Sequence, residues 1–208
     1  EHPARIRKVF AEREKSDQGF YVLRLYFLGQ MRYITVDDKL PIETYYWYAD
    51  DSSIINSGMS DNGAWWMPVL EKGFAKYMKD YLAMDGGWET VALRALTGMP
   101  SDRFKTTELT EQEVYDTIAE NDDNNNIITA ACLTAVSGLV PGHAYTVLGV
   151  NKTDRRIILR NPWSSEEYYG VGADQTDDGV FEVPPSIFVE AFPNFSIAYY
   201  KDWVHTEI

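Results

Sequence analysis

Residues 138–163, GLVPGHAYTVLGVNKTDRRIILRNPW, decide the fold because they predict a β-hairpin with polar side chains at its open end. The run AYTVLGV and the later run RIILR are rich in apolar and β-branched residues, and the polar NKTD between them is typical of a turn. If His143 pairs with Asn161, the bend lies near Lys152. The hairpin then brings an imidazole and a carboxamide within cross-strand reach.

An imidazole beside a carboxamide is suited to proton transfer. The imidazole of His143 can act as general base and acid near neutral pH, and the amide oxygen of Asn161 can hold its other ring nitrogen in one tautomer. A nucleophile is still needed, and in Cys-His-Asn sites a thiolate pairs with the histidine. Trp163, two residues beyond Asn161, is placed to cover the hydrogen bond from water.

Composition limits the possible partners. The 208 residues suit one domain or one and a half, and 45% apolar residues provide a core. A net charge of −13 argues against nucleic acid or an anionic membrane as the main partner, and no apolar run is long enough for a membrane span. A single cysteine excludes an internal disulfide and favours a reducing, cytoplasmic location, and the charged start EHPARIRKVF is no signal peptide.

The first part of the chain predicts one helix and several strands. Apolar spacing predicts the helix, and β-forming runs around a Gly-Gln pair predict a hairpin. The expected elements are a helix over residues 2–15, a hairpin of strands 20–28 and 31–36, a chain turn at 40–41, a short aromatic strand at 45–48 and a surface loop at 50–63.

The rest of the chain predicts helices that alternate with strands. Apolar residues spaced by three and four indicate the longest helix, and Thr110 with Glu113 forms a capping box before a later one. The expected helices are 64–82, 89–96, 110–120 and 185–192, and the expected further strands are 127–133, 179–183 and 195–200. This order predicts an α+β fold with a mainly antiparallel sheet flanked by helices.

Five stretches of this sequence resemble the second half of the calpain protease core, a papain-like cysteine endopeptidase module. They are GFYVLRLYFLGQMRYITVDDKLP (19–41), the segment from WMPVLEKGF to RALTG (66–98), LVPGHAYTVLGV (139–150), ILRNPWSSEEYYG (158–170) and DDGVFEVPPSIFVEAF (177–192). The resemblance implies a papain-like α+β fold with an antiparallel sheet or barrel subdomain. It assigns His143 as the catalytic base, Asn161 as its orienting partner, Trp163 as the shielding indole and Gly142 as a supporting residue.

The resemblance also implies a part of the core that lies upstream. In the calpain pattern the nucleophilic cysteine and the glutamine of the oxyanion hole stand at the head of an earlier helix, in the same or another chain. We therefore expect residues 1–18 to be the tail of the Cys-bearing helical subdomain and residues 19–204 to form the subdomain with the histidine and the asparagine. Cys132, 11 residues before His143, is expected to be a buried small hydrophobe.

The resemblance further implies a calcium site after the Asn-Pro-Trp sequence. Glu167, Asp174 and Asp178 stand at the corresponding positions, and carboxylate oxygens on a loop suit this ion. Val180, however, replaces the second acid of the acidic turn. An intact site and a weakened or absent site are therefore both kept as hypotheses.

Two functional hypotheses follow from these residues. The leading one is a calpain-like, calcium-dependent type of cysteine endopeptidase in the cytoplasm that cleaves peptide bonds of protein or peptide substrates. The alternative is a catalytically inactive, calpain-derived module that serves as an interaction or scaffold part of a larger assembly. A cysteine before Glu1, in a setting like Gln-x5-Cys-Trp, would favour the enzyme.

Overall fold

The computed structural model describes residues 3–11, 16–44, 52–54, 64–84, 86–174 and 176–200. The chain divides into two compact units, which are described separately below. Unit 1 comprises Glu1–Gly87 with Ala95–Gly98, and unit 2 comprises Trp88–Arg94 with Met99–Ile208. The expected division after residue 18, between two halves of a longer core, stays a prediction.

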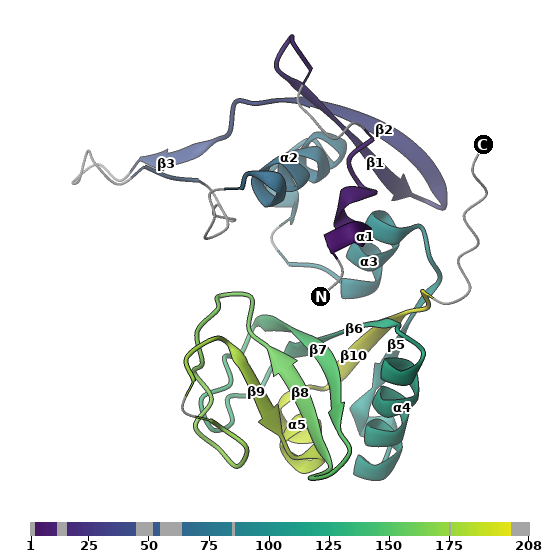
Figure 1. Ribbon diagram of the computed structural model, residues 1–208, viewed down its shortest axis with the longest axis vertical. Coiled ribbons are helices and arrows are strands. Elements are labelled where there is room, and N and C mark those ends of the chain that lie inside the picture. The colour runs from purple at the N-terminus through teal and green to yellow at the C-terminus, as the bar shows by residue number, and fades with distance from the viewer. Residues whose placement is uncertain are drawn as a thin grey trace. The chain divides into compact units, whose positions relative to one another are not determined.

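Unit 1 is built on a two-stranded antiparallel ribbon that packs against a helix. The ribbon is β1 (Phe20–Phe27) with β2 (Gln30–Asp37), and the helix is α2 (Trp66–Met78) (Figure 1). Its other elements are α1 (Pro3–Arg7), β3 (Ile42–Thr44), β4 (Ser52–Ile54) and the short 3₁₀ helix η1 (Leu82–Met84). The expected hairpin is confirmed.

The turn of this hairpin and its packing follow from local chemistry. Leu28 and Gly29 both have positive φ angles, 53° and 74°, as a two-residue type I′ turn requires. Alternate residues of β1, Leu23 and Leu25, are fully buried against α2. Gly73 allows this approach, because a Cβ atom there would clash with the side chain of Leu23.

The helix expected over residues 2–15 is much shorter in the structure, since α1 ends at Arg7. The chain then runs beside β1. The carbonyl of Val9 accepts a hydrogen bond from the Arg24 N–H at 2.6 Å, and Phe10 forms a β-bridge with Leu23. Val9 is buried in the core of unit 1, so its apolar side chain serves the ribbon and not a helical stripe. Residues 12–15 and the strand expected at 45–48 lie outside the described residues.

Unit 2 contains an open six-stranded antiparallel sheet. The strand order is β5-β10-β6-β7-β8-β9, so β5 and β9 are its edges. The strands are β5 (Ser101–Lys105), β6 (Ile127–Cys132), β7 (His143–Asn151), β8 (Arg156–Arg160), β9 (Val180–Val183) and β10 (Asn194–Ala198). The expected α+β class with a mainly antiparallel sheet is confirmed, and the described strands form no closed barrel. Strand β5 was not predicted from the sequence.

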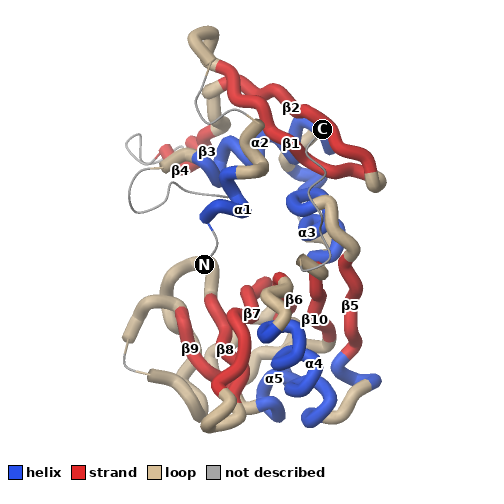
Figure 2. Tube along the Cα trace, turned by 45° about the vertical axis from the view of Figure 1, so that its right-hand side comes forward, coloured by secondary structure: helices blue, strands red, loops and turns tan. Residues whose placement is uncertain are grey.

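Two helices cover one face of this sheet (Figure 2). These are α4 (Glu111–Asp123) and α5 (Pro185–Ala191), which contact each other and the central strands. Between them and the sheet lies an aromatic core of Tyr145, Phe181, Phe188, Phe192 and Phe195. The 3₁₀ turn η2 (Thr106–Glu108) precedes α4, and α3 (Glu89–Thr97) contributes residues to both units.

The four helices expected after residue 63 are confirmed with boundaries shifted by a few residues. The capping box before α4 is complete: the Glu113 N–H donates to the Thr110 hydroxyl at 3.2 Å, and the Thr110 N–H donates to the Glu113 carboxylate at 2.8 Å. The longest helices of the described chain, α2 and α4, have 13 residues each. None of the described helices combines the length and apolar character that membrane crossing requires.

The central hairpin of β7 and β8 forms with a different register from the predicted one. Thr146 pairs with Arg160, and one step further along this register Tyr145, not His143, lies opposite Asn161. The register also shifts between Val147 and Gly149, which marks a β-bulge. Because the error is two residues, it leaves the side chains of His143 and Asn161 on the same face of the sheet.

The bulge depends on Gly149 and on α4. Gly149 has a φ angle of 141°, which only glycine adopts readily, and a Cβ atom there would clash with the carboxylate of Asp122. That carboxylate accepts a hydrogen bond from the Val150 N–H at 3.1 Å. An aspartate on α4 therefore holds β7 at the bulge, a contact between positions far apart in the sequence.

We predict that Gly149→Ala lowers the free energy of unfolding by about 2–3 kcal/mol, because it adds backbone strain and displaces Asp122. Urea denaturation followed by circular dichroism measures the loss. Gly29→Ala is the matched control, since Gly29 also has a positive φ but open space around its Cβ position, and it should cost about 1 kcal/mol. Equal losses in the two variants would contradict the role given to Asp122.

Candidate functional site

His143 and Asn161 are joined by a hydrogen bond in unit 2. His143 is the first residue of β7, and Asn161 directly follows β8. The ring nitrogen Nε2 of His143 lies 2.8 Å from the amide oxygen Oδ1 of Asn161. The predicted closeness of the two side chains is therefore confirmed, although the strand register that suggested it is not.

The amide of Asn161 is fully buried and held from three sides. Its oxygen also accepts a hydrogen bond from the Trp163 N–H at 3.1 Å, and its nitrogen donates to the Ser165 carbonyl at 3.0 Å. A flipped amide would point N–H groups at the Trp163 N–H and oxygen at the Ser165 carbonyl. The hydrogen bonds of the loop therefore determine which end of the amide faces His143.

This orientation assigns the tautomer of neutral His143. Since the group facing Nε2 is an acceptor, Nε2 carries the hydrogen and donates it to Asn161. The other ring nitrogen, Nδ1, then keeps its lone pair. The site thus offers a proton acceptor at Nδ1 on a ring whose plane is fixed by the asparagine, which is the arrangement that general base catalysis needs.

Two aromatic side chains enclose the imidazole. The ring centroids of Trp163 and His143 are 4.1 Å apart, and the two ring planes are tilted by 36°. The Tyr145 ring meets the imidazole edge-on, with a centroid distance of 4.9 Å. Tyr145 is buried, and its hydroxyl accepts a hydrogen bond from the Val140 N–H at 3.0 Å. Tyr145 was not selected from the sequence, although its place two residues after His143 on a strand puts both side chains on one face.

Glycines shape the backbone around the pair. Gly142 has a φ angle of 75°, donates its N–H to the Cys132 carbonyl at 2.8 Å, and has open space where a Cβ atom would stand. Gly179 accepts a hydrogen bond from the Asn161 N–H at 2.8 Å. A Cβ atom on Gly179 would press against Ser164 and the Asn161 carbonyl, so the loop after β8 requires glycine there.

Cys132 is a buried structural residue. It pairs directly with His143 across β6 and β7, but its side chain has no exposed area and its thiol donates to the Thr134 carbonyl at 3.3 Å. Burial raises the pKa of the Cys132 thiol, so the reactive thiolate is disfavoured. The expectation that Cys132 is a small buried hydrophobe is confirmed.

The acids expected to bind calcium are not gathered around one point. Glu167 is exposed and accepts a hydrogen bond from the Ser165 hydroxyl at 3.2 Å. The carboxylates of Asp174 and Asp178 accept from the backbone N–H groups of Thr176 and Val180, at 2.6 and 2.8 Å. Across the described ranges, no group of three or more His, Cys, Asp or Glu side chains has a metal-binding arrangement.

Glu166, which was not selected from the sequence, interacts with two of these acids. Burial, followed by the negative charge of Asp174 and then that of Asp178, raises the pKa of Glu166. Its carboxylate oxygen Oε1 is buried without a hydrogen-bond partner in the described part of the chain. With two adjacent glutamates, the sequence does not reveal which side chain turns toward the acidic loop.

Comparison with known proteins identifies the family of this chain. The model of the calpain family of cysteine proteases matches residues 1–179. The calpain-type cysteine protease DEK1 of Zea mays is 27% identical over 190 residues, which cover 84% of this chain and 8% of that protein. Human calpain-9 is 27% identical over 160 residues, covering 70% of this chain and 22% of calpain-9.

The catalytic subunit of human calpain-1 is 26% identical over 176 residues, which cover 77% of this chain and 23% of that subunit. The matched part thus spans less than a quarter of the length of each of these relatives. The family model, however, covers most of this chain, including both His143 and Asn161. This chain therefore belongs to the calpain family of cysteine proteases.

Proposed function

We propose that this chain carries the histidine and asparagine of a calpain-type cysteine endopeptidase that cleaves peptide bonds in protein substrates. The observation that carries the proposal is the His143–Asn161 hydrogen bond, which leaves Nδ1 as the proton acceptor. The nucleophilic cysteine would come from an upstream segment, in the same or another chain. Family membership supports the protease class.

In this proposal each residue of the site has a defined task. Nδ1 of His143 takes the thiol proton, the thiolate attacks the scissile carbonyl, and the imidazolium returns the proton to the leaving amine. Water then cleaves the acyl-enzyme with His143 as base again. Asn161 holds the ring throughout, and Trp163 covers the side of the imidazole against which it packs.

The second candidate is a non-catalytic module within a larger assembly. It is supported by Val180, which stands where the calpain pattern has the second acid of the acidic turn. The two candidates differ in what the full-length protein does. The cytoplasmic location expected from the single cysteine, and a larger assembly as partner, stay predictions.

We predict that this chain alone hydrolyses no peptide and takes up no thiol-directed protease inhibitor at Cys132. In a serine protease, loss of the triad nucleophile lowers kcat by a factor on the order of 10⁶. Supplying the Cys-bearing half, by full-length expression or as a partner chain, should restore both peptide hydrolysis and inhibitor labelling. A fluorogenic peptide assay and mass spectrometry of the labelled protein measure these outcomes.

Two variants sharpen this test. His143→Ala should abolish the restored hydrolysis, whereas Cys132→Ala should retain it per folded molecule because the Cys132 thiol is buried and turned to Thr134. Cleavage by the isolated chain together with labelling of Cys132 would overturn the assignment of the nucleophile. If a full-length protein that carries an upstream cysteine shows neither hydrolysis nor labelling, the result would instead support the non-catalytic module.

We predict that Asn161→Ala reduces the restored kcat/KM by at least about 10²-fold, since the imidazole loses its orienting acceptor. Asn161→Asp should move the basic limb of the pH–rate profile to higher pH, because a carboxylate raises the pKa of the adjacent imidazole. Asn121→Ala is the control. Asn121 is also a buried asparagine of unit 2, but its partners are Thr117 and Asn126. An unshifted profile in Asn161→Asp would contradict the orienting role.

Calcium binding at Glu167, Asp174 and Asp178 stays a proposal, and we add Glu166 of the same loop as a fourth acid. It is supported by the surroundings of Glu166, because burial and the charges of Asp174 and Asp178 disfavour its ionised carboxylate. A divalent cation would offset this repulsion between carboxylates. Because no described group of three or more acids has a metal-binding arrangement, binding, where it occurs, requires the loop to rearrange. No catalytic step is assigned to the ion.

We predict that calcium raises the melting temperature of this chain and that Asp174→Ala reduces the gain. Glu166→Gln should raise the melting temperature in chelator, by removing one of the repelling charges, and should also reduce the gain from calcium. Asp116→Ala, at an exposed aspartate that bonds Gln112 on α4, is the control. Identical melting curves with calcium and with chelator would contradict calcium binding by this chain.

A further inference from the structure

Unit 1 contains a cavity that the proposed protease function does not use. It has a volume of about 530 Å³ and lies between the ribbon and α2. The ribbon contributes Phe20 and the segment from Thr35 to Asp37, whereas α2 and the chain after it contribute three lysines and Tyr81. A cavity of this size accommodates a small molecule.

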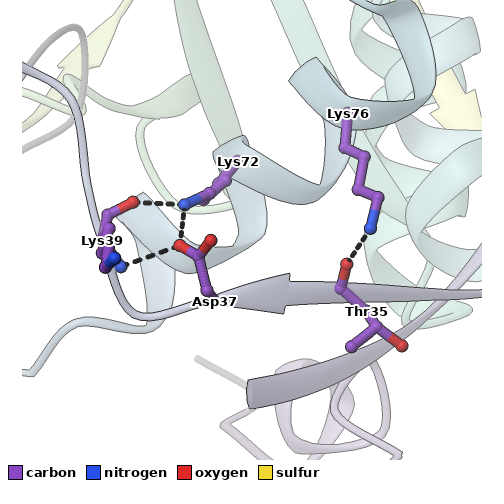
Figure 3. Close-up of polar contacts among 5 residues, drawn as sticks. All are labelled: Thr35, Asp37, Lys39, Lys72 and Lys76. Atoms are coloured by element: carbon purple, nitrogen blue, oxygen red, sulfur yellow. Dashed lines mark hydrogen bonds and ion pairs between the residues drawn. The ribbon is translucent and has the colours of Figure 1, made fainter. Parts of the chain in front are cut away.

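The three lysines follow the helical repeat toward the end of α2. Lys72, Lys76 and Lys79 are spaced by four and three residues, which places them on one face. Lys76 donates to the Thr35 carbonyl at 2.5 Å (Figure 3). An ammonium group has three N–H donors, so Lys76 retains donors for a ligand. Lys79 has a left-handed conformation at the end of α2, and its ammonium group forms no hydrogen bond or ion pair with any described residue.

The acid nearest to the lysines is already neutralised. Lys72 pairs with the carboxylate of Asp37 and also donates to the Lys39 carbonyl, and the Lys39 N–H donates to the same carboxylate (Figure 3). The hydrogen bond from Lys72, followed by that from the Lys39 N–H, lowers the pKa of Asp37. Asp80, the other acid of the lining, accepts from the Leu82 N–H. Lys76 and Lys79 are therefore not needed as counterions to Asp37.

The hydroxyl group of Tyr81 is a hydrogen-bond donor that has no acceptor among the described residues. Its hydroxyl oxygen is buried and has no hydrogen-bond partner in the described part of the chain. Burial, and then the charges of Glu71 and Asp37, raise the pKa of Tyr81, so the hydroxyl is protonated at neutral pH. A buried hydroxyl without a protein partner is unfavourable, so a ligand that accepts this hydrogen bond would be favoured.

We propose that this cavity binds a small molecule with a phosphate group attached to an apolar part. Three donors from different positions, on Lys76, Lys79 and Tyr81, suit a tetrahedral group with several acceptor oxygens, and lysine binds phosphate as a point charge. Phe20, 40% exposed at the cavity, provides an apolar wall beside them. This proposal is independent of the protease function, because no residue of the His143 site takes part.

The test is an NMR titration of this chain with phenyl phosphate, compared with inorganic phosphate, phenol and benzoate. Phenyl phosphate should bind saturably and more tightly than the other three. Lys79→Ala and Tyr81→Phe should each weaken its binding by about tenfold, the loss expected for one charge-assisted hydrogen bond. Lys105→Ala, which removes an exposed lysine of β5 outside the cavity, should leave the binding unchanged.

Tyr81→Phe also tests the premise in the absence of ligand. Because the hydroxyl lacks a partner, its removal should leave the melting temperature unchanged or raise it, whereas a lower melting temperature would show that the hydroxyl is used within the protein. The proposal is overturned if phenyl phosphate fails to saturate at millimolar concentration, or if its binding is equally weakened by Lys105→Ala. Equal affinity for benzoate would overturn the assignment of phosphate.

Discussion

The buried amide of Asn161 is the interaction on which the site of unit 2 depends. It links the end of β8, the loop after it and the first residue of β7 through hydrogen bonds to Trp163, Ser165 and His143. An unsatisfied amide at zero exposure would be costly, so the loop conformation and the imidazole orientation are stabilised together. The same contacts that fold the loop therefore determine which nitrogen of His143 can accept a proton.

Packing behind the pair makes this arrangement rigid. Tyr145 meets the imidazole edge-on and reaches into the aromatic core, where its ring contacts Phe181 of β9 and Phe192 after α5. The bulge at Gly149 is held from α4 by Asp122. The position of His143 thus rests on side chains from most of unit 2, in agreement with the general rule that sites are supported by a rigid scaffold.

Much of this could be predicted from local sequence, and the failures have physical causes. Apolar periodicity, β-forming runs and caps located the hairpin of unit 1, α4 and the hairpin that brings His143 close to Asn161. The register of β7 and β8 was wrong because the turn lies between Asn151 and Arg156, later than the predicted bend near Lys152, and the bulge held by Asp122 changes the pairing by only one residue. The first helix was predicted too long because Val9 packs against the ribbon, and Glu166 was missed because the sequence does not show which of two glutamates turns inward.

The burial of Cys132 makes the chain's only thiol a natural reporter of local opening in unit 2. Cys132 lies on β6 within the hydrophobic core and has no exposed area, so a reagent in solution reaches its sulfur only after the packing around β6 opens. The rate of thiol modification in native buffer then measures the free energy of that opening. Because Cys132 is the strand partner of His143, the measurement reports how firmly the sheet holds its histidine in place.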